Sequence, residues 1–452
     1  MRNTRARYLG ASLATLLVQY GVHGLTHAAF GQKVWGAHLD LFLPTPGTVL
    51  EFIFRSKQAN STRIPVLVLV AIVDVTVAWV LLRSAIRRAS ATNRSSLLAC
   101  LAAVPLIQIP VIGWLGGSKP FEATQVPAAA NPLSLRTAAT GLVAGLVVAV
   151  LLEVVSTLLF RTYGFVLFLG SPFIVGCITG YIGNRRSDIG AWPTTRLVLG
   201  ACFLGCVGLL AVALEGVLCL VMAAPLIAMT AWLGGLVGRA LTLKGRGSAP
   251  GRLASSFVAL PLLLVIDRVA PPDVAFESVE SIRVDAPQRD VWEAIVHMGP
   301  IPEPPPVPFR WGLAYPMSGS IRGSGVGAIR EGVFSTGVAY ERVTAWHPDE
   351  ELAFIVLSDP PTLHELSPYR EVHAPHLNGY FRTLDARFTI TPLADGHTQL
   401  SLTTHHQLLL GPTLYWLPIA KWAVYTNKRR VLAHFAEQAE ATAAAKPTRR
   451  QT

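Results

Sequence analysis

Residues 282–298 read IRVDAPQRDVWEAIVHM. Within them the spacing of apolar residues changes from that of a strand to that of a helix, and this change decides the fold of the C-terminal half. Residues 277–285 alternate between apolar and polar side chains, which is typical of a half-buried strand. Asp285 then supplies a capping acid, Pro287 a first-turn proline, and Gln288 the glutamine three residues after the acid. One helix face carries apolar side chains: Val291, Trp292, Ile295 and Val296. A strand followed directly by an amphipathic helix is therefore predicted.

Downstream of this helix, apolar side chains mostly recur at every second residue, as in strands. Strands are predicted at 317–323, 326–334, 337–346, 352–358, 379–391 and 398–408, joined by turn signals. A long helix is predicted from 414 or 418 to 442, with Trp422, Val431, Leu432 and Phe435 facing inward and Lys428, Arg429 and Arg430 in solvent. This order predicts an α+β domain over 275–442, in which a curved antiparallel sheet wraps the last helix and leaves a cavity. Residues 443–452 are predicted to form a disordered tail.

The first 270 residues have a different composition. The chain of 452 residues has a mean hydropathy of +0.45 and only 14% charged residues, which excludes a set of ordinary soluble domains. Residues 1–272 carry 22 Lys and Arg against 8 Asp and Glu, whereas residues 273–452 carry 16 against 19. The excess positive charge lies in the apolar half, where basic residues flank spanning helices. We therefore predict a lipid bilayer as a partner and no nucleic acid.

An N-terminal all-α transmembrane helical bundle of seven or eight spans is predicted over 1–270. A span needs about 20 mostly apolar residues. The candidate segments are 8–28, 64–83, 97–116, 137–160, 164–183, 197–214, 216–238 and 253–270. The last segment contains Pro261, so the sequence leaves open whether there are seven or eight spans. With eight spans, the basic residues divide nine against thirteen between the two sides, which leaves the side of the C-terminal half of this multi-pass cell membrane protein undecided.

Ionisable groups inside the spans are candidates for function. Gln19, His23 and His27 lie on one helix stripe, and Asp74 and Glu153 lie on later spans. Two imidazoles on one stripe can bind metal or relay protons, but no second histidine pair on another span completes a site. We interpret the stripe as interhelical hydrogen bonding and the five cysteines as packing residues. The sequence predicts no metal and no cofactor.

Three segments carry a family resemblance: 282–298 as quoted, GSGVGAIREGVFSTG at 323–337 and VTAWHPDEELAFIV at 343–356. Together with the order of elements, they resemble the SRPBCC superfamily, whose START-like members are often described as polyketide cyclase/dehydrase-like or lipid-transport-like. The segment ELSPYREVHAPHLNGYFRT at 365–383 is similar to bacterial members in which this domain follows a membrane region. The resemblance covers about a third of the chain and implies a helix-grip fold. It does not fix an activity, because one fold hosts unrelated functions.

Strand alternation assigns side chains to the predicted cavity. On 380–390 the inner face carries Tyr380 and Arg382 among apolar residues, on 326–334 it carries Arg330, and on 398–408 it carries His406. The sequence thus predicts that both arginines and His406 project into one apolar chamber.

The 359–378 loop is predicted to cover the cavity mouth, with Tyr369 at its rim. A buried guanidinium requires an acidic partner. Glu365 or Glu371 of the loop supplies it, or else the carboxylate or phosphate of a ligand does. Histidines of this loop match no standard metal spacing, and we count His376 among the ligand-binding residues.

Three functions stay open. The first is a membrane-anchored protein that binds a hydrophobic or amphipathic small molecule or lipid in a helix-grip cavity. The second is a cyclase/dehydrase-type enzyme acting on a membrane-delivered substrate, with a histidine and Glu365 as its acid/base pair. The third is a transporter with a ligand-sensing soluble domain. The glycines of 323–327 are not read as a nucleotide fingerprint, because a strand follows them where the fingerprint requires a helix.

Overall fold

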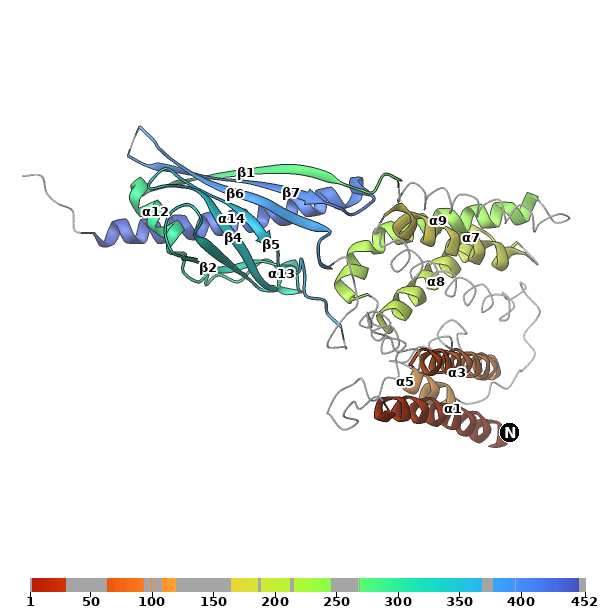
Figure 1. Ribbon diagram of the computed structural model, residues 1–452. Coiled ribbons are helices and arrows are strands. Elements are labelled where there is room, and N and C mark those ends of the chain that lie inside the picture. Colours follow the sequence, from red (N-terminus) through yellow and green to blue (C-terminus); the bar gives the residue numbers. More distant parts are fainter. Residues whose placement is uncertain are drawn as a thin grey trace, which may run out of the picture. The chain divides into compact units, whose positions relative to one another are not determined.

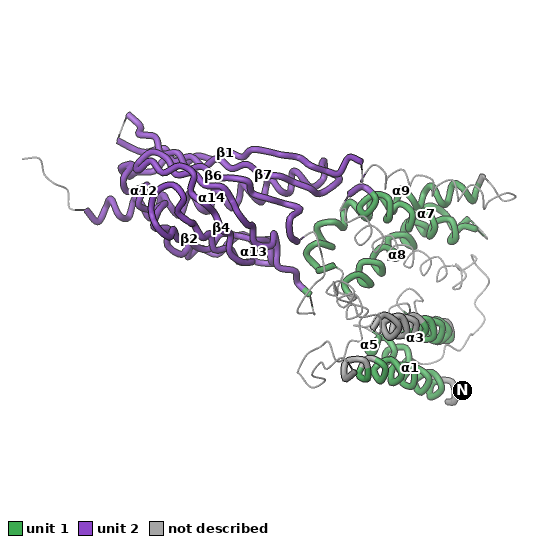
Figure 2. The backbone as a smooth tube through the Cα atoms, viewed as in Figure 1, with its two compact units in different colours: residues 1–161, 166–264, 367–374 green, residues 162–165, 265–366, 375–452 purple. Residues whose placement is uncertain are grey.

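The computed structural model describes residues 2–29, 63–92, 99, 102, 108–118, 164–185, 188–211, 215–244, 267, 269–367, 377–394 and 396–446. The chain divides into two compact units (Figure 2). Unit 1 comprises residues 1–161, 166–264 and 367–374, and unit 2 comprises 162–165, 265–366 and 375–452. The described secondary structure of unit 1 is helical, whereas unit 2 contains the sheet (Figure 1).

Helices α1 (Arg2–Ala29), α3 (Arg63–Ala91) and α5 (Gln108–Gly117) of unit 1 pack on one another around a shared apolar core. Arg88 of α3 is buried, and its guanidinium donates to the carbonyl oxygens of Leu115 (3.2 Å) and Ser118 (2.7 Å). The arginine thereby satisfies carbonyls at the end of α5 that have no partner within the helix. Gln19 of α1 is buried as well. The side chains of His23, His27, Asp74 and Glu153 lie outside the described residues.

Three described helices are long and apolar enough to cross a membrane: Val166–Asn184, Ala191–Leu210 and Val217–Leu243. They comprise the π-helical turn η4 (Val166–Gly170) with α7 (Ser171–Asn184), then α8 (Ala191–Ala211) and α9 (Val217–Lys244). They correspond to the predicted spans 164–183, 197–214 and 216–238.

The prediction of seven or eight spans is too high for the described part of the chain. Helices α1 and α3 exist where spans 8–28 and 64–83 were predicted, but they are not among the three that qualify. Within 97–116 the described helix is α5, whose 10 residues extend only about 15 Å. The predicted span 137–160 and residues 253–266 of the predicted span 253–270 lie outside the described residues.

Helices α7 and α9 lie in close backbone contact because glycines face each other. A Cβ atom added at Gly176 or Gly180 would lie 2.0 or 2.3 Å from a carbonyl oxygen of α9. One added at Gly234 or Gly238 would lie 2.0 or 2.1 Å from a carbonyl oxygen of α7. Each pair is spaced at i, i+4, the small-residue spacing that brings transmembrane helices together. This spacing is visible in the sequence, but the sequence reasoning did not use it.

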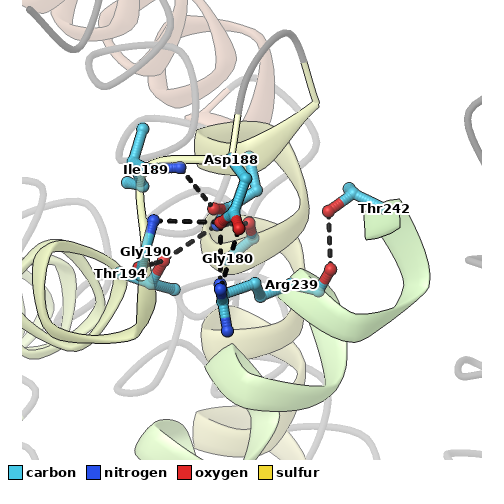
Figure 3. Close-up of polar contacts among 8 residues, drawn as sticks. Gly180, Asp188, Ile189, Gly190, Thr194, Arg239 and Thr242 are labelled. Atoms are coloured by element: carbon cyan, nitrogen blue, oxygen red, sulfur yellow. Dashed lines mark hydrogen bonds and ion pairs between the residues drawn. The ribbon is translucent and has the colours of Figure 1, made fainter. Parts of the chain in front are cut away.

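Polar contacts hold the turn between α7 and α8 and connect it to α9 (Figure 3). Buried Asn184 donates from Nδ2 to the Gly180 carbonyl (2.8 Å) and to Thr194 Oγ1 (2.9 Å). Arg239 of α9 forms a two-pronged ion pair with Asp188, each N–O distance being 2.9 Å. The loop is thereby fixed to all three helices.

Unit 2 is a seven-stranded antiparallel sheet with a long helix, in the strand order β1-β7-β6-β5-β4-β3-β2 (Figure 1). The strands are β1 (Val274–Val284), β2 (Pro316–Arg322), β3 (Ile329–Phe334), β4 (Gly337–His347), β5 (Glu351–Ser358), β6 (Phe381–Pro392) and β7 (Thr398–Leu408). The helices are α12 (Gln288–Val296), α13 (Val307–Arg310) and α14 (Thr413–Ala445). Every predicted strand is present, and the arrangement fits the helix-grip fold. The short α13 was not predicted, because prolines dominate its surroundings.

The apolar core of unit 2 lies between the sheet, α12 and the C-terminal half of α14. Trp292 packs edge-on against Trp346 with ring centroids 5.3 Å apart, and Phe435 packs in the same way on Phe388 at 5.5 Å. Each such buried side chain contributes about 1.5–3 kcal/mol. On α14 this core extends no further toward the N-terminus than Val431 and Leu432, and on β7 it ends at Leu402.

The helix start at α12 differs in detail from the prediction. Pro287 is its N-cap residue and no side chain caps it, so the capping role predicted for Asp285 is wrong. Asp285 instead contacts His397 Nδ1 at 2.6 Å. Gln288 donates to the Asp349 carbonyl at 3.1 Å, which attaches the first turn of the helix to the β4–β5 turn.

Candidate functional site

Polar residues interrupt the apolar inner face of β1, β7 and β6. Ser278 of β1 pairs with Thr404 of β7, and His406 pairs with Phe276 on one side and Thr383 on the other. Thr404 and His406 are 6% and 4% exposed. They therefore lie on the buried face of β7, as the alternation predicts.

His406 is enclosed by aromatic rings. Its imidazole stacks on Phe276 and Phe381, with centroids 5.1 and 5.3 Å apart. Nε2 lies 2.8 Å from Thr404 Oγ1, while Nδ1 is buried and has no hydrogen-bond partner among the described residues. Burial, together with the positive charge of Lys428, lowers the pKa of His406 to about 3. The imidazole is therefore neutral at pH 7.

Lys428 of α14 is buried at 4% exposure, so its predicted position in solvent is wrong. Its Nζ donates to the carbonyl oxygen of Ser278 (2.5 Å) and to Ser278 Oγ (3.3 Å). Burial lowers the pKa of Lys428 to about 8, against the effect of Glu280 and Glu277, so the amine is mostly protonated at pH 7.

Arg330 of β3 belongs to a second polar group. It is buried, forms an ion pair with Glu341 of β4 and lies over the ring of Phe354 at 4.7 Å. The two strands pair Arg330 directly with Glu341, so the prediction that Glu365 or Glu371 supplies the acid is wrong. Burial raises the pKa of Glu341, while the charge of Arg330 opposes that rise.

Arg382 is exposed, and its predicted inward orientation is wrong. The β6–β7 pairing contains an irregularity at Leu384, between Thr383 and Asp385. Such a bulge inserts one residue and exchanges the two faces of the strand. Thr383 therefore faces inward before the bulge, and the even-numbered residues from Ala386 onward face inward after it.

Of the remaining predicted site residues, the structure describes Glu365 and Tyr380. Glu365 is buried. Tyr380 is half-buried, and its carbonyl accepts a hydrogen bond from Leu409 N at 2.8 Å. Tyr369 and His376 lie outside the described residues, so the loop as a lid stays a prediction. The single chamber predicted for both arginines and His406 is replaced by two groups, on β7 and β3, with β6, β5 and β4 between them.

No family model and no curated protein sequence matches the chain. Among solved structures, the ZhuI aromatase/cyclase of Streptomyces sp. R1128 matches at 15% identity and a TM-score of 0.26, over 38% of this chain and 100% of that one. A protein of Mesorhizobium loti matches at 16% identity and 0.24, over 37% and 98%. Truncated norcoclaurine synthase of Thalictrum flavum matches at 12% identity and 0.24, over 39% and 98%.

Proposed function

We propose that unit 2 binds a hydrophobic or amphipathic small molecule between its sheet and α14, and that the helices of unit 1 anchor the chain in a membrane. The observation that carries this proposal is a polar group set into the buried apolar face. Past Leu402 and Leu432 the buried faces of β7 and α14 carry Thr404, His406 and Lys428 before apolar residues resume at Leu408 and Val424. Polar groups inside an apolar layer orient a guest, which is the usual composition of a small-molecule site.

Anchoring suits such a ligand. Three helices in the described part of the chain are long and apolar enough to cross a bilayer. A lipid-like molecule is scarce in water and abundant in the bilayer, so a tether raises the effective concentration of the binding domain where the ligand is.

The test is photolabelling of the full-length chain in phosphatidylcholine nanodiscs. The probes are palmitic acid and hexadecanol, each with a diazirine in its acyl chain, and labelled peptides are mapped by mass spectrometry. We expect labelling of peptides from β1, β6, β7 and α14. Labelling confined to the helices of unit 1 would show that the probes only partition into lipid, and the proposal would be abandoned.

Neighbouring residues on β6 offer a matched pair of variants. Thr383 faces inward beside His406, whereas Leu384 is 42% exposed. Thr383→Trp fills the inner face and should lower labelling of unit 2 about tenfold. Leu384→Trp adds a large ring to the outer face and should leave labelling unchanged.

A cyclase-type enzyme is the second candidate, because the site holds a neutral imidazole beside an ammonium group. The unprotonated fraction of Lys428, whose pKa is about 8, can remove a proton next to a carbonyl, and His406 can polarise that carbonyl through Nδ1–H. The test is hydrogen–deuterium exchange at the central carbon of a long-chain 1,3-diketone, followed by NMR. Catalysed exchange that is lost in His406→Phe supports the enzyme, and an uncatalysed rate in the intact protein excludes it.

A further inference from the structure

Lys428 differs from two other buried charged groups of unit 2. Arg330 is paired with Glu341, and buried Asp290 is paired with Lys446. Lys428 is equally buried, yet no carboxylate of the described residues lies within 4.0 Å of its Nζ, and its acceptors are the two oxygens of Ser278. Glu280 and Glu277 act on this ammonium only from a greater distance. A buried charge with no carboxylate in contact is costly, so this position is suited to an anion from outside the chain.

The hydrogen-bonding capacity of this group is also incomplete. A lysine ammonium has three N–H donors, and the described residues supply two acceptors to Lys428. His406 leaves Nδ1 without a partner. If Thr404 Oγ1 donates to Nε2, the tautomer of the neutral ring carries its proton on Nδ1, which is then a second unused donor.

Lys428 and His406 are anchored at neighbouring positions of the sheet. Ser278, which holds Lys428, and Thr404, which holds His406, are direct cross-strand partners on β1 and β7. Residues opposite each other in this way have Cβ atoms about 5 Å apart. Two adjacent donors match the two oxygens of one carboxylate. The rings of Phe276 and Phe381 beside the imidazole supply apolar contact for the remainder of a ligand that carries this carboxylate.

We propose that Lys428 and His406 bind the carboxylate of an acyl ligand, with one carboxylate oxygen at the ammonium and the other at Nδ1. This inference rests on the proposed function and specifies the chemical class of its ligand as a long-chain carboxylic acid. An alcohol of the same chain length offers one oxygen and no charge, so the site distinguishes the two. Lys428 and His406 act here as binding residues.

The experiment uses the same full-length protein and the same pair of diazirine probes, palmitic acid and hexadecanol, on the variants Lys428→Met and Arg429→Met. Arg429 is the exposed neighbour on the same helix and bonds only Tyr425 among the described residues, so it controls for the loss of one positive charge. We expect Lys428→Met to lower labelling of unit 2 by the acid at least about tenfold, as loss of a charge-assisted hydrogen bond implies. Labelling by the alcohol should change less than about twofold, and Arg429→Met should change neither.

Each outcome decides one of the two proposals. If neither probe labels unit 2 in the unaltered protein, the proposed function fails. If both probes label unit 2, but Lys428→Met leaves the ratio of acid to alcohol labelling unchanged, the carboxylate site is refuted and the proposed function stands. His406→Gln keeps the Nε2-type bond to Thr404 and removes the Nδ1 donor, so it should lower the acid-to-alcohol ratio as well. Retained alcohol labelling in each variant shows that unit 2 is still folded.

Discussion

Acidification is expected to destabilise unit 2 through His406. Burial holds the pKa of its imidazole at about 3 in the folded chain, against 6.5 for an ordinary histidine. As the pH falls below 6.5, the unfolded chain takes up a proton that the folded chain does not. The stability contributed by His406 is therefore complete above pH 6.5 and is lost progressively down to pH 3. At about pH 5 the loss amounts to 1.5 pKa units, or about 2 kcal/mol.

The assay compares the free energy of unfolding of unit 2 at about pH 8 and pH 5 in the full-length protein and in His406→Gln. Samples are equilibrated in urea at each pH and then given a short deuterium pulse at one common pH. Deuterium uptake by the peptide of β7 reports the unfolded fraction, and linear extrapolation gives the free energy. Other groups also titrate in this range, so the informative quantity is the difference between the two proteins.

From pH 8 to pH 5, the free energy of unfolding of His406→Gln should rise by about 2 kcal/mol relative to that of the unaltered protein. His347→Gln is the matched control, because His347 is exposed on β4 and undergoes the same replacement. A difference between His406→Gln and the unaltered protein that stays constant with pH would refute the reasoning. It would mean that His406 is equally free to take up a proton in the folded and unfolded chains.

Three further predictions concern packing and buried charge. Gly234→Ala places a methyl group 2.0 Å from a carbonyl oxygen of α7 and should sharply lower the yield of monodisperse protein in detergent, whereas Gly205→Ala, with nothing within 4 Å, should not. Phe435→Ala removes a ring that is 0% exposed and should cost unit 2 about 3–5 kcal/mol by the urea assay. Arg330→Leu leaves Glu341 buried without its partner and should cost about 3–5 kcal/mol in the same assay. Adding Glu341→Leu should recover most of it, and a double variant as unstable as the single one would show that packing, not charge, is lost.

The element order of unit 2 could be predicted because its signals are local. Each strand carries its own alternation, and the turn residues mark where strands end. The helix after β1 was found in the same way. The number of spans was not, because long apolar runs do not show where a helix begins and ends. In the run at 97–116 the described helix has only 10 residues.

The site residues were harder to predict because the face of a strand depends on its pairing. Leucine at position 384 does not indicate a bulge, yet the bulge there turns Arg382 outward. Glu341 had a usable signal, since it alternates with Ala339 and Val343, which are both buried. Lys428 had one as well, since it lies four residues from both Val424 and Leu432, which are buried. Lys428 was predicted to lie in solvent because lysine is charged, although its spacing on the helix indicated the buried face.

The charge of the domain bears on how an acid would be recognised. Residues 273–452 carry 16 basic and 19 acidic side chains, so their net field does not attract an anion. Glu277 and Glu280 also lie close enough to Lys428 to raise its pKa. Selectivity for a carboxylate must then come from direct contact with the buried ammonium, where the low dielectric strengthens a charged pair. Salt screens exposed charges far more than buried ones, so this preference for acid over alcohol should survive high ionic strength.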